Sequence, residues 1–76
     1  MKLSGVKSKL TEKQDLIVDV MRNPSDLSEW VIWIRKQSGK SHLLVTDDES
    51  VIRSKDANAI LSLLMDVGVK NVHFSL

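Results

Sequence analysis

An unbroken apolar run from Trp30 to Ile34 limits the possible folds of this chain more than any other feature of its sequence. Its five residues are all β-branched or aromatic, the types that are enriched in β-strands. Because side chains alternate between the two faces of a strand, Trp30 and Trp33 would point in opposite directions. A strand at this position therefore carries a tryptophan on each face.

The segment from Ser25 to Lys36 is also compatible with a helix that begins at Ser25 as its N-cap. In this helix Leu27, Trp30, Val31 and Ile34 would lie on one face. Against this, residues 37–40 supply turn-forming types, and residues 42–46 supply a second apolar strand. We therefore predict a β-hairpin here, with the helix as the alternative.

The size of the chain limits it to a single core. A domain of 76 residues buries only about 60% of the surface that its unfolded chain exposes, so its stability is marginal without further support. The chain has no cysteine, which excludes disulfides and cysteine-based metal sites and favours a reducing, cytoplasmic location. Nothing in the sequence has the pattern of a signal peptide or a membrane span. Self-association is then the leading source of extra stability.

We predict a flexible basic N-terminal arm over residues 1–9 and a single domain over residues 10–76. The arm contains Lys2, Lys7 and Lys9 but no acidic residue, and its apolar residues show no clear periodicity. It would therefore lie outside the fold.

The domain is predicted to begin with a helix, because Thr11 to Gln14 fits the capping box that often starts one. Apolar residues then recur at helical spacing opposite a charged face. Asn23 and Pro24 end this helix, since proline disfavours the helical conformation in the residue before it. The apolar helical face consists of Leu16, Ile17, Val20 and Met21.

The second half of the chain is predicted to contain a polar turn and a short third strand within residues 47–53. A second helix follows from Ser54, its expected cap, to Val67, and Gly68 provides a left-handed C-terminal cap. Residues 69–76 alternate as in a half-buried strand. The prediction is thus a small single-domain α+β fold of order α-β-β-(β)-α-β, with an antiparallel or mixed sheet and helices on one face.

Three motifs suggest chemistry but lack an essential part. Residues 39–41 match the end of a phosphate-binding loop, but Ile34 stands where that loop needs its first glycine. The acidic residues 47–49 lack the alternation of an EF-hand and are interpreted as a solvated turn. His42 and His73 have no third metal ligand at a suitable spacing. We therefore expect no catalytic residue, no metal and no cofactor.

We predict a non-enzymatic protein-interaction module of accessory, inhibitor or regulatory type. It would form a homodimer and bind an unidentified protein through a sheet face or a strand edge. If both helices cover the Trp30 side of the sheet, the other face stays free, and tryptophan and arginine are typical of interface hot spots. If the first helix packs over Trp33 instead, that residue belongs to the core, and this alternative stays open. The residues predicted to bind the partner are Val31, Trp33, Arg35 and Leu44.

The alternative function is a nucleic-acid-binding module that uses the basic arm and the hairpin. Such a module needs its basic residues on one surface, and its binding weakens steeply with salt because it releases counterions. The eleven basic residues are nearly balanced by ten acidic ones, which makes this function the second choice. The nucleic-acid contacts would be Lys2, Lys7, Lys9, Lys36 and Lys40.

Overall fold

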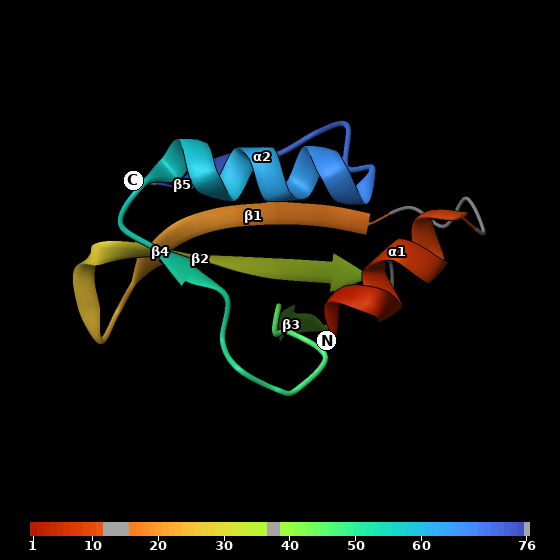
Figure 1. Ribbon diagram of the computed structural model, residues 1–76, viewed down its shortest axis with the longest axis horizontal. Helices are drawn as coiled ribbons and strands as arrows, with labels where there is room; N and C mark the ends of the chain where they lie inside the picture. Colours follow the sequence, from red (N-terminus) through yellow and green to blue (C-terminus); the bar gives the residue numbers. More distant parts are fainter. Residues whose placement is uncertain (12–15, 37–38, 76) are drawn as a thin grey trace.

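The computed structural model describes residues 1–11, 16–36 and 39–75, which form one small α+β domain. Two helices and a mixed sheet of five strands make up this described part of the chain, so the predicted fold class is confirmed (Figure 1). The elements are α1 (Leu3–Thr11), β1 (Leu16–Asn23), β2 (Asp26–Lys36), β3 (Ser41–Leu43), β4 (Arg53–Ser54), α2 (Ala57–Val67) and β5 (His73–Ser75).

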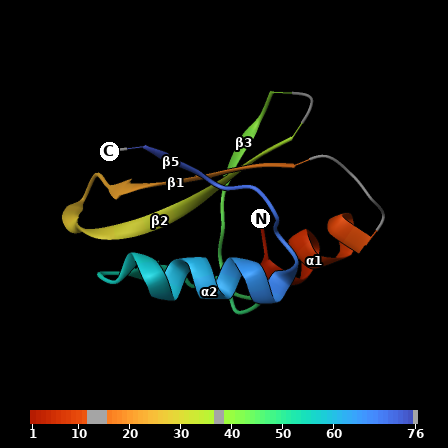
Figure 2. The ribbon, with the colours of Figure 1, turned by 90° about the horizontal axis from the view of Figure 1, so that it is seen from above.

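The sheet is built around a long antiparallel hairpin of β1 and β2. Its strand order is β3-β2-β1-β5, and β4 also pairs with β2. The strands β3 and β4 run antiparallel to β2, whereas β5 runs parallel to β1. Figure 2 shows the sheet edge-on, with α1 and α2 on the same side of it. The predicted architecture, with helices on one face of the sheet, is therefore confirmed.

Residue parity decides which face of the sheet a side chain takes. In the β1–β2 register, Val18 lies opposite Ile34 and Val20 lies opposite Ile32. All four side chains are at most 2% exposed and belong to the core beside the helices. The registers of β3, β4 and β5 keep this order, with even-numbered residues toward the helices and odd-numbered residues away. We call these two faces the helix side and the open face.

The core lies between the helix side of the sheet and the two helices. Helix α1 contributes Val6 to it, and α2 contributes Ile60 and Leu64. Each such fully buried aliphatic side chain stabilises the fold by about 1.5–3 kcal/mol relative to its exposed form. The buried core residues are Val6, Val18, Val20, Ile32, Ile34, Leu44, Ile60, Leu64 and Val69.

The predicted first helix was wrong for residues 16–23, which form β1. The apolar residues that fit a helical face, such as Ile17 and Val20, lie on opposite faces of this strand. Val20 is fully buried, whereas Ile17 is 39% exposed on the open face. Pairing with β2 along the whole strand satisfies the backbone groups that a helix would have paired internally. The predicted capping box extends beyond Thr11 into residues outside the described part of the chain.

The predicted N-terminal arm was also wrong, because residues 3–11 form α1 and pack on the sheet. Val6 is fully buried, and Met1 and Leu3 pack against the core. At the start of α1, Leu3 N donates to Val45 O at 2.9 Å, and Val45 N donates to Met1 O at 2.9 Å. The i, i+3 spacing of the apolar residues was the signal for this helix, and the lysines between them obscured it.

Two predicted turns and one of the two predicted caps of α2 are found in the structure. The β2–β3 hairpin is confirmed, and so is the polar turn after it, in which Glu49 N donates to Thr46 O at 2.9 Å. Helix α2 ends before Gly68, whose φ of 107° is left-handed as predicted. Its N-cap, however, is Asp56 rather than Ser54, because the Asp56 carboxylate accepts from Asn58 N. Neither described helix has the length and hydropathy needed to cross a membrane.

The final strand, β5, is shorter than predicted, and its residues are exposed rather than half-buried. On the helix side of the sheet, Phe74 of β5 makes an edge-to-face contact with Trp30 of β2, and the two ring centroids are 5.8 Å apart. The guanidinium carbon of Arg22 lies 4.6 Å from the centre of the Trp30 ring. This contact is a cation–π interaction, which typically contributes about 0.5–1 kcal/mol at an exposed site. Trp30 thus connects β1, β2 and β5.

Two glycine-to-alanine changes should have opposite effects on stability. Gly68→Ala places a side chain in a left-handed conformation and should lower the free energy of unfolding by about 1–2 kcal/mol. Gly5→Ala lies in α1, where the new Cβ would meet Met1 Cγ at an ordinary 3.8 Å, and should raise it by about 0.5–1 kcal/mol. Urea denaturation of both variants measures the difference, and equal effects would contradict the geometry of the two sites.

Candidate protein-interaction surface

Neither described helix covers the open face, because both lie on the other side of the sheet (Figure 2). The centre of this face is apolar. Trp33 is half-buried there, opposite Asp19 of β1 and Leu43 of β3. Val31 lies on the same face but is only 3% exposed. Neighbouring side chains therefore close over Val31 and begin a second apolar layer on the side of the sheet opposite the core.

Four apolar residues meet around a hollow of about 330 Å³ on this side of the sheet. They come from β2, β3 and the segment before β4, so they are brought together only by strand pairing. The polar border of the hollow consists of the turn at residues 23–25 and Arg53. We call the four residues the open-face cluster: Val31, Trp33, Leu43 and Val51.

The prediction that Leu44 lies beside Trp33 was wrong. Leu44 is fully buried in the core, and its backbone N donates to Ile32 O at 2.9 Å. Leu43 takes the predicted place, because the β2–β3 register sets it opposite Trp33. A shift of one residue along a strand exchanges its two faces, so adjacent leucines have opposite roles.

The alternative in which the first helix buries Trp33 does not apply to α1. Val6 of that helix lies in the core with Ile34, on the opposite side of the sheet from Trp33. Trp33 is thus a residue of the open face, and Trp30, three residues earlier in the same strand, is packed against the core. The two tryptophans occupy the two faces that strand alternation predicted for them.

The charged residues of the open face lie around its apolar centre. Arg35 is exposed at the end of β2, beyond Trp33. At the other end, Arg53 Nε lies 3.8 Å from Glu29 Oε2, and the Glu29 side chain is only 16% exposed. Sequence reasoning found Arg35 but missed this ion pair, because β4 becomes a neighbour of β2 only through the sheet.

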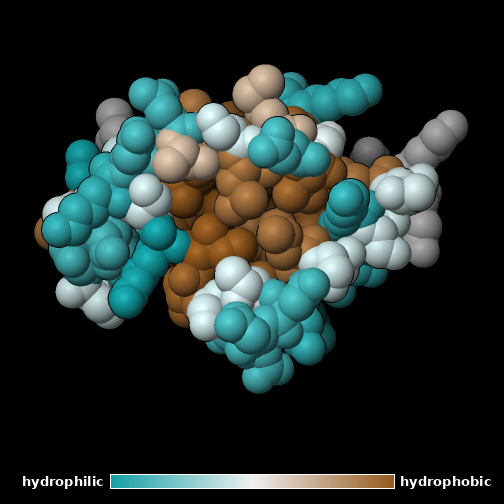
Figure 3. Space-filling model, viewed as in Figure 1, coloured by the Kyte–Doolittle hydropathy of each residue, from teal (hydrophilic) through white to brown (hydrophobic). Residues whose placement is uncertain are grey.

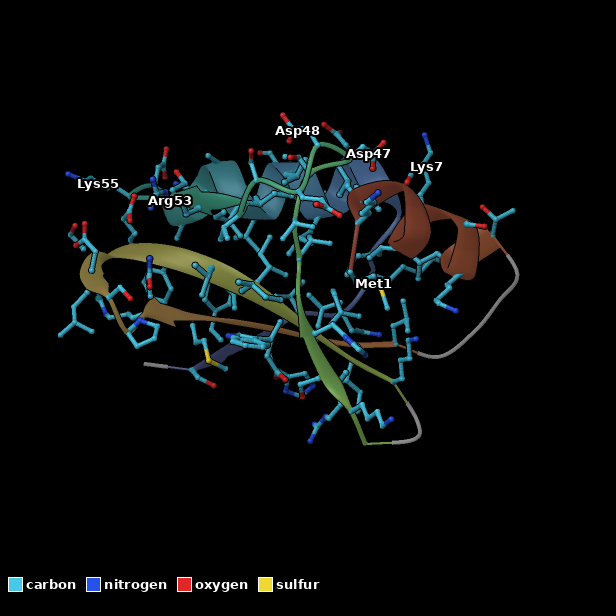
Figure 4. All side chains as sticks on the ribbon, turned by 90° about the horizontal axis from the view of Figure 1, so that it is seen from below. Met1, Lys7, Asp47, Asp48, Arg53 and Lys55 are labelled. Atoms are coloured by element: carbon cyan, nitrogen blue, oxygen red, sulfur yellow. The ribbon has the colours of Figure 1, made fainter. Side chains whose placement is uncertain are left out.

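The five lysines predicted to contact nucleic acid do not gather on one surface. Lys2 Nζ lies 4.0 Å from Glu49 Oε1, and Lys7 borders the same hollow as Asp47 and Asp66 (Figure 4). Lys36 ends β2 on the helix side and Lys40 precedes β3, and this end of the β2–β3 hairpin lies apart from α1 in Figure 2. Lys9 lies in the last turn of α1.

The two histidines lie at opposite edges of the sheet. His42 in β3 pairs with Ile34 on the helix side, whereas His73 in β5 pairs with Asp19 on the open face. They cannot share a metal ion across two intervening strands. In the part of the chain that the structure describes, no group of three potential metal ligands is found.

The acidic turn uses one carboxylate to hold its own backbone. The Thr46 hydroxyl and the Ser50 amide both donate to Asp48, and these hydrogen bonds lower the pKa of that carboxyl below its usual value. Asp47 instead accepts from Ser4 N at 3.2 Å, at the start of α1. Both contacts are typical of turns and helix starts, and they agree with the predicted role of this segment as a turn.

A second hollow lies on the helix side, between α1 and α2. Figure 3 shows apolar residues gathered in the middle of this face with polar residues around them. The hollow measures about 400 Å³ and has Leu3, Leu63 and Val67 among its lining residues. These three residues pack against the core, so the hollow is an opening between core elements.

The two adjacent leucines provide a test of the face assignment. Leu44→Ala removes a fully buried side chain and should lower the free energy of unfolding by about 2–5 kcal/mol. Leu43→Ala truncates a half-buried residue of the open face, so its effect should be smaller than half of that. Denaturant unfolding of both variants makes the comparison, and a larger loss at position 43 would contradict the register.

Comparison with protein-family models, with curated protein sequences and with solved structures found no match to this chain.

Proposed function

We propose that this chain is a non-enzymatic protein-interaction module of accessory or regulatory type that binds protein partners, including its own kind, through the open face. The observation that carries the proposal is the position of Trp33. This residue lies half-buried on a sheet face that neither described helix covers. A stable small domain gains from covering such a face with another protein surface.

The composition of the open face supports this function. Tryptophan and arginine are enriched among the residues that dominate binding energy, and Trp33 and Arg35 lie two residues apart on the same face. The hollow beside Trp33 can receive a side chain from a partner. Charged residues at both ends of the apolar centre provide the polar rim that is usual around an interface.

Nucleic-acid binding is not favoured by the positions of the lysines. Binding to a phosphate backbone requires a continuous basic surface, and here Lys2 and Lys7 lie next to acidic side chains. Lys36 and Lys40 lie apart from them, at the end of the β2–β3 hairpin. In the described part of the chain, the five lysines do not form one continuous basic surface that a single strand of nucleic acid could follow.

The two tryptophans form a matched pair for testing the proposal. Trp33→Ala should abolish binding to protein partners while thermal unfolding stays cooperative, because Trp33 lies outside the core. Trp30→Ala removes a side chain that packs on the core, on Phe74 and on Arg22, so it should lower the free energy of unfolding by about 3 kcal/mol. Circular dichroism measures unfolding, and pull-down from cell extract compares the proteins retained by each variant.

Met65→Ala serves as the control, because Met65 is an apolar residue of α2 that is 73% exposed away from the open face. This variant should retain the same proteins as the wild type. The proposal fails if Trp33→Ala unfolds the domain, or if Trp33→Ala and Met65→Ala retain identical sets of proteins.

A further inference from the structure

We infer that a second copy of this chain covers the open face, in a symmetric dimer whose two sheets pack face to face. This inference rests on the proposed function and names one partner for it. Closed two-fold dimers are the commonest oligomers, and their interfaces use the same surface of both chains. The open faces of the two copies must therefore be complementary to each other in shape and in charge.

The size of the molecule limits such a dimer to an interface of standard size at most. Viewed onto the sheet, the whole molecule, with α1 and the loops included, measures 34 × 23 Å, an outline of roughly 800 Å². One side of a standard stable interface buries about the same area. Most of this face must then take part, including its charged ends as well as the open-face cluster.

The apolar centre fits itself about one particular axis. A two-fold axis that runs across the strands at the level of Ile32 places position 33 of one chain over position 31 of the other. Trp33 then lies over Val31 of the partner copy, beside the hollow that the open-face cluster borders. The strands of the two sheets become antiparallel, which belongs to the aligned class of sheet packing.

The same axis also pairs the charges. It places Arg35, three residues beyond Ile32, over Glu29 of the partner copy, three residues before it. Among the described residues of the five strands, the open face carries Asp19 and Glu29 against Arg35 and Arg53, so like charges do not oppose self-association. Glu29 would then lie between an arginine of its own chain and one of the partner.

An axis along the strands gives a poorer fit. If it ran between β1 and β2, each residue would face its own cross-strand neighbour in the partner copy. Trp33 would then lie over Asp19, and Arg35 would lie over Ile17. Each of these two residues, the ones that tryptophan and arginine enrichment marks as important for binding, would then face a group of the other polarity. The axis across the strands also sets Asp19 over Met21 and Leu43 over Arg53, but it gives Trp33 an apolar partner and Arg35 an acidic one. The axis across the strands is therefore the one that the residues favour.

The first measurement is the mass of the wild-type protein in solution, by sedimentation over a dilution series. We expect twice the monomer mass, and Trp33→Ala should raise the dissociation constant by roughly thirtyfold or more. A wild-type protein that stays monomeric at millimolar concentration overturns the dimer. The binding of other proteins through the open face still stands if the pull-down depends on Trp33, so the failure of the dimer and the failure of the interaction surface can be told apart.

The second measurement tests the axis by cross-linking, which is clean because the chain has no cysteine of its own. Chains carrying Arg35→Cys are mixed with chains carrying Glu29→Cys and treated with a short bismaleimide. We expect mixed 35–29 cross-links. Arg35→Cys alone should not cross-link, since its two copies lie six residues apart along the strands, roughly 20 Å. Each mixed dimer keeps one intact Arg35–Glu29 pair.

Ser62→Cys, an exposed position on α2, is the control and should give no cross-links above the background of random collisions. Cross-links between two copies of Arg35→Cys would overturn the proposed axis even in a dimeric protein. Mixed 35–29 cross-links that vanish when Trp33→Ala is added support the dimer and its axis together.

Discussion

The antiparallel pairing of β1 with β2 is the interaction on which the rest of this structure depends. Its register sets Val18 opposite Ile34 and Val20 opposite Ile32, which makes one face of the hairpin continuously apolar. Both helices pack against that face, and β3, β4 and β5 all pair with one of these two strands. A shift of β2 by one residue would turn Trp33 toward the helices and remove the core from beneath them.

The open face follows from the same pairing. Both helices lie on one side of the sheet, and the strand that builds the core carries Trp33 and Val31 on its other side. Their neighbours in space come from β3 and from the segment before β4, so the cluster is assembled from distant parts of the chain. A chain of this size buries a large part of its apolar residues in one core and leaves the rest on its surface.

Local sequence signals predicted some elements correctly and gave wrong predictions for others. The hairpin of β2 and β3 and the left-handed cap at Gly68 were right, because turn residues and glycine act through their own backbone conformation. Residues 16–23 were wrong because Ile17 and Val20 satisfy a helical stripe as well as a strand. Only the presence of β2 beside them selects the strand. Residues 3–11 were wrong because lysines diluted the apolar spacing of a short helix.

The sequence by itself determined that two tryptophans of one strand point to opposite faces, because alternation is a property of the extended backbone. It also determined the β2–β3 turn, the polar turn after β3 and the left-handed cap at Gly68, since these depend on single residues and their nearest neighbours. The tertiary structure alone decided that Trp33 rather than Trp30 is left uncovered, and that Leu43 rather than Leu44 accompanies it. The physical reason is that a face is assigned by strand register and by helix packing, and both are relations between segments far apart in the chain.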